Sequence, residues 1–160
     1  MRLPRTIRLD SSDDNVFERA ARPGEWAVSG AFAFSDVDFE TLDGKGKQAY
    51  ACGFLGTFSF GRATFVEVAE ATNEEVEAVV TALADHFVAE YGAPDRAAAL
   101  PVAEEEVEFA AGLCEHKLHT LLRVEREPGE AGVIERFSAV QTPGEPEHAK
   151  IWNIVEDDNG

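Results

Sequence analysis

The chain has few cysteines and no long hydrophobic run, and these two absences limit its class. Two cysteines among 160 residues are too few for the disulfide framework that small secreted domains use. Because no run of about 18 apolar residues occurs, the sequence predicts no membrane-spanning helix. The opening residues MRLPRTIRLD lack the apolar segment of a secretory signal. We therefore expect a cytoplasmic protein.

Basic residues are also scarce. The chain has 14 Lys and Arg residues against 31 Asp and Glu residues, a net charge of −17. The imbalance lies in residues 51–160, where seven basic residues stand against 22 acidic ones. Such a surface repels phosphate backbones and anionic lipid head groups, which argues against nucleic acids and membranes as partners. A basic protein partner is a better electrostatic match, although acidity alone also keeps a protein soluble.

The sequence contains none of the short motifs that bring a known chemistry with them. It has no GxSxG nucleophile motif. The segment Asp43–Lys47 (DGKGK) resembles a phosphate-binding loop, but Gln48 stands where a Walker A loop needs Ser or Thr. We expect no cofactor, and these absences favour a role other than catalysis.

The segment 72–92, TNEEVEAVVTALADHFVAEYG, gives the clearest structural signal in the chain. Thr72 and Glu75 have the spacing of a capping box, which predicts the start of a helix. Gly92 and Pro94 predict its end. Between them, apolar residues recur at helical spacing and predict one buried stripe: Val76, Val79, Val80, Leu83, Phe87 and Tyr91.

Alternating apolar residues and Pro-Gly turns elsewhere predict short strands and tight connections. A second main helix is expected over 101–113, since proline suits a first helical position, and a short helix near 47–55. The predicted strands are residues 3–9, 16–20, 25–34, 63–69, 117–126 and 133–141.

These elements predict an α+β fold. One antiparallel sheet of about six strands should have the helices 72–92 and 101–113 packed on one face. Residues 1–142 form a single domain in this interpretation. Residues 143–160 form a polar, acidic C-terminal tail, in which only 151–155 has the apolar character of an edge strand.

An aromatic patch interrupted by glycines lies between residues 50 and 65. Its candidate ligand-binding residues are Tyr50, Phe54, Phe58 and Phe60. Phenylalanine is first a core residue, so a packed interior is the preferred interpretation of these rings, and the lining of a pocket or contact surface is the alternative. A small-molecule-binding domain that uses this patch is therefore one alternative function.

Cysteine and histidine come together once, at Cys114, His116 and His119. These residue types ligate zinc or support thiol chemistry. If a helix continues through them, the two histidines share a face. If a strand begins near His116, they point apart and read as ordinary surface residues. A metal-dependent or thiol enzyme is the second alternative.

Three segments, RTIRLD, VFERAARPGEWAVSGAFAF and QAYACGFLG, resemble an uncharacterised proteobacterial family with a domain of unknown function. The resemblance covers nearly the whole chain and implies no activity and no site residue. It implies an accessory role, because relatives of this kind are encoded near biotin/lipoate-ligase-like proteins and molybdoenzyme maturation factors.

The leading hypothesis is therefore a cytoplasmic accessory or interaction protein that assists a cofactor ligase or molybdoenzyme maturation. It would act on a protein partner. Ala78, Ala82 and Ala89 lie on a face of the 72–92 helix roughly opposite its apolar stripe. Small residues allow close approach of another element, which fits a homodimer, but alanines also occur on exposed helix faces simply because they favour helix.

Overall fold

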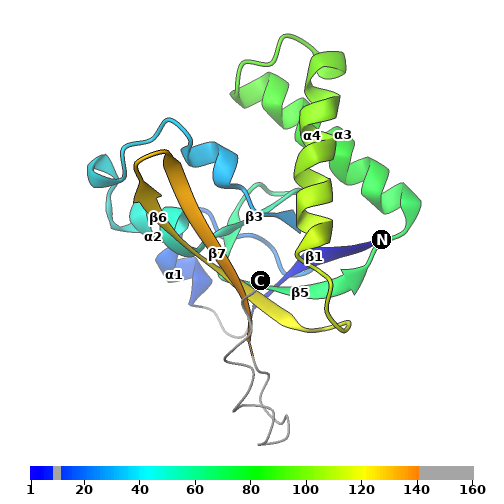
Figure 1. Cartoon of the computed structure of the whole chain (residues 1–160), viewed down its shortest axis with the longest axis horizontal. Coiled ribbons are helices and arrows are strands. Elements are labelled where there is room, and N and C mark those ends of the chain that lie inside the picture. Colours follow the sequence, from blue (N-terminus) through cyan, green and yellow to red (C-terminus); the bar gives the residue numbers. More distant parts are fainter. Residues whose placement is uncertain (9–11, 141–160) are drawn as a thin grey trace, which may run out of the picture.

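The computed structural model describes residues 1–8 and 12–140 and shows two antiparallel sheets with a helical hairpin at one end (Figure 1). The four-stranded sheet has the order β1 (Arg2–Ile7), β5 (Phe65–Glu70), β6 (Leu121–Gly129), β7 (Gly132–Val140). The three-stranded sheet has the order β2 (Ala27–Val28), β3 (Phe54–Gly56), β4 (Arg62–Ala63). The helices are α1 (Asp13–Val16), α2 (Gly44–Cys52), α3 (Asn73–Glu90) and α4 (Arg96–Gly112), with 3-10 turns at Ala31–Phe34 and Phe39–Thr41.

This arrangement confirms the α+β class but not a single sheet of about six strands. The described chain forms two sheets, which are linked by an isolated bridge between Arg5 and Trp26. α3 and α4 pack together beyond one end of the sheets, while α2 lies near the turn of the β6–β7 hairpin (Figure 1). No helix among the described residues is long and apolar enough to cross a membrane.

Helix α3 forms as its sequence predicts. The Thr72 hydroxyl accepts a hydrogen bond from the Glu75 N–H at 3.1 Å, and the Glu75 carboxylate accepts one from the Thr72 N–H at 2.8 Å. The capping box is therefore confirmed. Val79, Leu83 and Phe87 of the predicted stripe are buried, whereas Tyr91 at its end is 47% exposed.

Helices α2 and α4 both begin at earlier residues than predicted. Asp95 caps α4 by accepting from the Ala98 N–H at 2.8 Å, which places Pro101 inside the helix instead of at its start. Asp43 caps α2 by accepting from the Gly46 N–H at 2.7 Å. In both cases the aspartate is the N-cap, so the helix starts before the predicted first residue, which was 101 for α4 and 47 for α2.

The predicted strand 16–20 does not form. Residues 13–16 form α1, and β1 pairs with β5 instead of with 16–20. The predicted strand 25–34 is reduced to β2, because Gly30 takes a positive φ of 79° and the chain then turns into a 3-10 helix. The predicted strand 63–69 is divided between β4 and β5.

The C-terminal hairpin is confirmed, with a shifted start. β6 and β7 pair in antiparallel register from Leu121 with Val140 to Gly129 with Gly132. Residues 117–120 are loop instead of strand. The predicted tail 143–160 and edge strand 151–155 lie outside the described residues.

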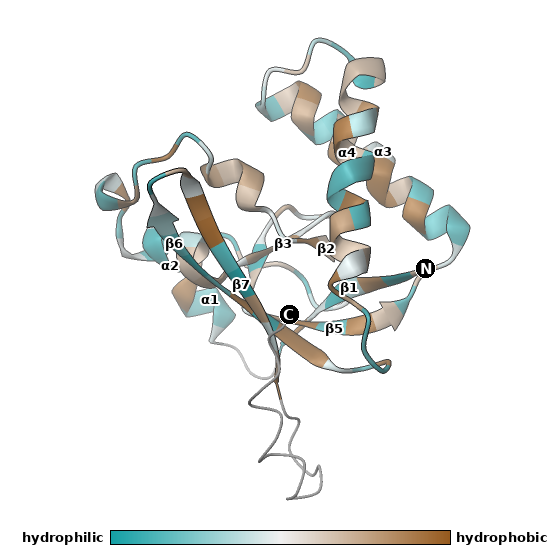
Figure 2. Ribbon diagram, viewed as in Figure 1, coloured by the Kyte–Doolittle hydropathy of each residue, from teal (hydrophilic) through white to brown (hydrophobic). Residues whose placement is uncertain are grey.

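Buried apolar side chains form two separate groups. Apolar and polar positions alternate along α3 and α4, which matches helices with one buried face (Figure 2). The group beneath the helical hairpin includes Leu3, Val28, Leu55, Leu83, Phe87 and Val107. The group centred on β5 and β6 includes Phe54, Val66, Val68, Leu122 and Val124.

Candidate functional site

A groove of about 410 Å³ lies between α3, the segment that leads into β2 and the loop that joins β3 to β4. We call it the Phe58 groove. Its lining is largely apolar, with Arg22, Glu25 and Glu75 as its charged members. The lining residues are Arg22, Pro23, Gly24, Glu25, Trp26, Thr57, Phe58, Glu75, Ala78, Val79 and Ala82.

The side chain of Phe58 is 72% exposed, although the backbone that carries it is firmly held. The Glu25 carboxylate accepts hydrogen bonds from the Phe58 N–H at 2.9 Å and the Ser59 N–H at 2.8 Å. It also accepts one from the Ser59 hydroxyl. Bonds from N–H groups to a carboxylate are stronger than neutral ones, so this loop is fixed around its exposed ring.

Glu25 is itself buried, with 6% of its surface exposed, and is held from three sides. Its backbone exchanges hydrogen bonds with Thr6 on β1, and its carboxylate accepts from the Arg22 N–H at 2.6 Å. A Cβ at Gly56 would lie 2.4 Å from the carboxylate, so only glycine fits there. Glu25 therefore connects β1, the 22–25 turn and the Phe58 loop.

The structure does not bring the four predicted aromatic residues into one pocket. Tyr50 and Phe54 are core residues with 2% and 0% exposure. Phe60 stacks on His86 with ring centroids 3.8 Å apart. Burial of His86 lowers the pKa of its imidazole, which keeps the stacked ring neutral. Among the four, only Phe58 lines the groove.

Cys114, His116 and His119 do not form one site either, because each side chain has different surroundings. Cys114 is buried, and burial raises the pKa of its thiol to about 12. His116 is exposed, and its carbonyl accepts a hydrogen bond from Arg2. His119 sits in the loop before β6, with its Nδ1 3.0 Å from a Glu67 carboxylate oxygen. In the part of the chain that the structure describes, no three His, Cys, Asp or Glu side chains are grouped to hold a metal.

The two thiols should differ in reactivity. Cys52 is half-buried at a 490 Å³ cavity, whereas Cys114 is buried in the core. Since the thiolate is the nucleophile, we expect Cys52 to react with an aromatic disulfide reagent at least about tenfold faster than Cys114 in the folded protein. Mass spectrometry of tryptic peptides after timed labelling measures both rates. A Cys52→Ser variant should lose the fast phase alone; equal rates would contradict this placement.

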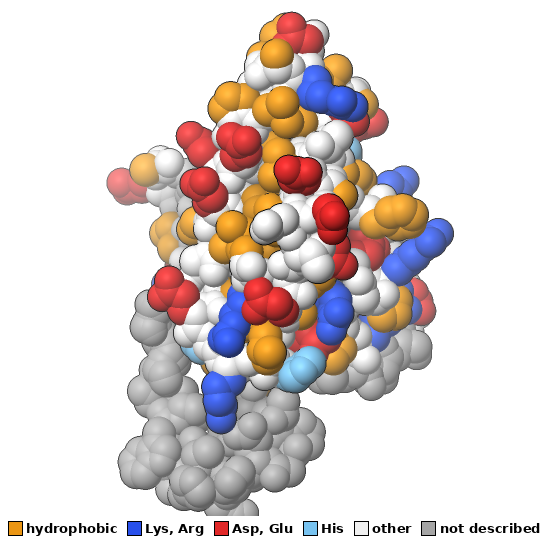
Figure 3. All heavy atoms as spheres, turned by 90° about the vertical axis from the view of Figure 1, so that its right-hand side faces the viewer, with side chains coloured by type: hydrophobic (Ala, Val, Ile, Leu, Met, Phe, Trp, Pro, Cys, Tyr) orange, Lys and Arg blue, Asp and Glu red, His pale blue; other side chains and the backbone are white. Residues whose placement is uncertain are grey.

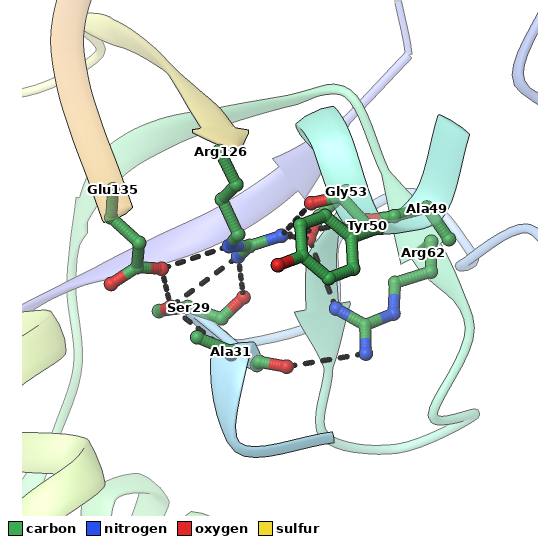
Figure 4. Close-up of polar contacts among 9 residues, drawn as sticks. Ser29, Ala31, Ala49, Tyr50, Gly53, Arg62, Arg126 and Glu135 are labelled. Atoms are coloured by element: carbon green, nitrogen blue, oxygen red, sulfur yellow. Dashed lines mark hydrogen bonds and ion pairs between the residues drawn. The ribbon is translucent and has the colours of Figure 1, made fainter. Parts of the chain in front are cut away.

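A polar cluster at the centre of the molecule is the second place where charged groups gather (Figure 4). The Arg126 side chain on β6 is fully buried. Its Nε donates to the Glu135 carboxylate on β7 at 2.9 Å. Its Nη1 donates to the carbonyls of Tyr50 at 3.1 Å and Gly53 at 2.9 Å, and its Nη2 to that of Ser29. The Tyr50 and Gly53 carbonyls lie at the C-terminal end of α2, where the helix dipole favours a cation.

Arg62 is a second buried guanidinium in the same cluster. It donates to the carbonyls of Gly53 at 3.0 Å and Gly30 at 3.3 Å, and its Cζ lies 4.7 Å from the centre of the Phe34 ring. Burial and the charge of Arg126 lower its pKa to about 9, so it stays protonated at neutral pH. Because both arginines bind carbonyls of their own chain, this cluster joins elements and does not offer its charge to a ligand.

Comparisons with known proteins give one result. No curated protein and no solved structure matches the chain. A family model described as "Family of unknown function (DUF6505)" matches residues 1–154. That match covers nearly the whole chain and confirms the resemblance to an uncharacterised family. The chain therefore belongs to the DUF6505 family of unknown function.

Proposed function

We propose that this protein is an accessory protein that binds a partner protein through the Phe58 groove. A single observation carries the proposal. Phe58 is 72% exposed, while a buried carboxylate fixes the backbone of its loop. An isolated domain gains nothing from holding a large apolar ring in water. A binding surface gains an anchor that is already in position.

The energetics of binding support this reading. Burying a phenylalanine side chain contributes about 1.5–3 kcal/mol. A loop that is already ordered loses little conformational entropy when it binds. The Arg22 guanidinium lies 5.3 Å from the centre of the Phe58 ring, and the half-buried Trp26 lines the same groove. Aromatic and arginine side chains dominate interface hot spots, so their proximity favours a protein partner.

A small-molecule ligand in the same groove is the second candidate. It rests on the volume of about 410 Å³, which falls in the range of ligand pockets. The Glu25 carboxylate, however, already accepts four hydrogen bonds from the chain. It therefore has little capacity to orient a ligand. A metal or thiol enzyme at Cys114, His116 and His119 has less support, because the structure does not gather these residues.

The finer role, in cofactor ligation or molybdoenzyme maturation, stays a prediction from the family resemblance. Capture experiments with the tagged protein in cells of its source organism test both the general accessory role and this finer one. They show whether a stoichiometric partner exists and which enzyme it is.

The Phe58→Ala variant tests the groove directly. We expect it to weaken capture of the partner by about 30-fold, since a central aromatic anchor contributes about 2 kcal/mol or more. Its free energy of unfolding should stay within about 0.5 kcal/mol of the wild type, because the ring is mostly in solvent. Phe109→Ala is the matched control, since Phe109 is 47% exposed on α4 and does not line the groove.

Two results would count against the proposal. One is recovery of the same partner by Phe58→Ala and wild type in equal amounts. The other is no stoichiometric protein partner at all, together with a small molecule that native mass spectrometry finds in the wild type and not in Phe58→Ala. The second result would move the assignment to the small-molecule alternative.

A further inference from the structure

A second groove of about 380 Å³ lies between α3 and α4. We call it the α3/α4 groove. Its floor is apolar and is formed by Val76 and Val80 from α3 and by Leu100 and Val107 from α4. Val80 is two positions from Ala78, a residue of the Phe58 groove, and so lies about 200° around the helix from it. The two grooves therefore occupy opposite sides of α3.

The rim of the α3/α4 groove is acidic. Glu77 on α3 and Glu104 and Glu108 on α4 line it, and all three are exposed. Glu104 and Glu108 are four positions apart and so lie on one face of their helix. In the described chain none of the three has an ion-pair partner, whereas Asp85 on the same hairpin is paired with Arg96 at 2.8 Å.

The side-chain charge on the two helices is almost entirely negative, and the N-terminal ammonium of Met1, which also lines the groove, is paired with Glu70 at 2.9 Å. Arg96 is the only Lys or Arg in the sequence of the two helices. The surface that carries α3 and the N-terminus shows apolar side chains flanked by acidic ones (Figure 3). An apolar floor with unpaired carboxylates on both sides is complementary to a surface that is apolar at its centre and basic at its margins.

We propose that the α3/α4 groove binds a basic amphipathic helix of a partner protein. A groove between two packed helices accepts a third helix, whose apolar residues at i, i+3, i+4 and i+7 face the floor. Lysine and arginine stems lie along apolar surface while their charged ends reach outward, here to Glu77, Glu104 and Glu108. The same carboxylates repel nucleic acid and anionic lipid, which lack the required charge.

This inference goes beyond the Phe58 groove and does not depend on it. The test uses a fluorescently labelled synthetic peptide of about 18 residues, which is five helical turns, with leucines on one face and lysines beside them. Two further peptides serve as comparisons: one of the same composition with its order scrambled, and one with glutamate in place of every lysine. Fluorescence anisotropy gives the Kd of each peptide for the full chain.

We expect the amphipathic lysine peptide to bind at least about tenfold more tightly than either comparison peptide. The triple variant Glu77→Gln/Glu104→Gln/Glu108→Gln should weaken its binding about tenfold, since each surface ion pair contributes a small amount. The matched control is Glu18→Gln/Glu115→Gln/Glu130→Gln, three exposed acids outside the groove. It removes the same charge and should change Kd less than about twofold. Phe58→Ala should also leave Kd unchanged.

Three results would overturn the inference. Equal affinity for the scrambled peptide would show only general attraction to an acidic protein. Equal weakening by the two triple variants would show that the lysine peptide does not bind the carboxylates of this groove in particular. Sedimentation that reveals a dimer in the wild type and a monomer in the groove variant would show that a second copy of the chain occupies the surface.

Discussion

Replacing Arg126 with methionine is expected to lower the free energy of unfolding by about 3–5 kcal/mol, the usual loss when one partner of a buried ion pair is removed. Methionine keeps much of the volume, so the loss reflects missing hydrogen bonds more than a cavity. The variant deprives Glu135 of its cation and leaves the Tyr50 and Gly53 carbonyls without this donor. Buried carbonyls without a partner are costly, because water no longer reaches them.

Urea denaturation followed by circular dichroism measures this loss. Arg123→Met is the matched control on the same strand, since its side chain is 49% exposed and is ion-paired at the surface with Glu125. It should change stability by less than about 1 kcal/mol. Adding Glu135→Leu to Arg126→Met should restore part of the stability, because no carboxylate is then left unpaired. Equal losses for Arg123→Met and Arg126→Met would show that the central cluster has no special structural role.

The Glu25→Ala variant is the second change with a large expected effect, a loss of about 3 kcal/mol. It removes the shared acceptor of the backbone N–H groups of Arg22, Phe58 and Ser59. Leaving three partly buried donors without their acceptor costs more than the mean value of a single hydrogen bond. The loop should then lose its fixed position, so the ring of Phe58 is no longer held for binding.

Hydrogen exchange separates the local effect from the global one. In Glu25→Ala the amides of Phe58 and Ser59 should exchange faster than the loss of global stability alone accounts for. Binding to the captured partner should also weaken at a temperature where the variant is still folded. Glu18→Ala, at an exposed acid of the same region, is the control and should change neither quantity. Unchanged protection at Phe58 and Ser59 would refute the role of Glu25.

Local signals in the sequence predicted the parts of the fold that depend on neighbouring residues. The capping box of Thr72 and Glu75 is a contact across three positions, and the β6–β7 hairpin closes through a short turn. Pairing of β1 with β5 joins residues more than about 50 positions apart, and no local pattern specifies such a partner. The alternation of residues 25–34 favoured a strand, but the positive φ of Gly30 ends it.

The candidate site was harder to predict for the same reason. Phe58 belonged to the predicted aromatic patch, but its sequence does not distinguish it from Phe54, which is in the core. Glu25 was predicted only as the first residue of the 25–34 strand, although it is the residue that organises the groove. Its bonds to residues 58 and 59 span 33 and 34 positions. The Cys114–His119 segment lies before β6 begins at Leu121, so neither predicted alternative for its histidines applies.

The position of Arg126 in the chain has a consequence for protein synthesis. The carbonyls that it binds belong to residues 29–53, which leave the ribosome long before it does. Strand β5 likewise gains its second neighbour in the sheet only after β6 has been synthesised. A nascent chain that has emerged only through α4 therefore lacks the guanidinium that binds these carbonyls, and we expect its centre to pack fully only after the last hairpin has been made.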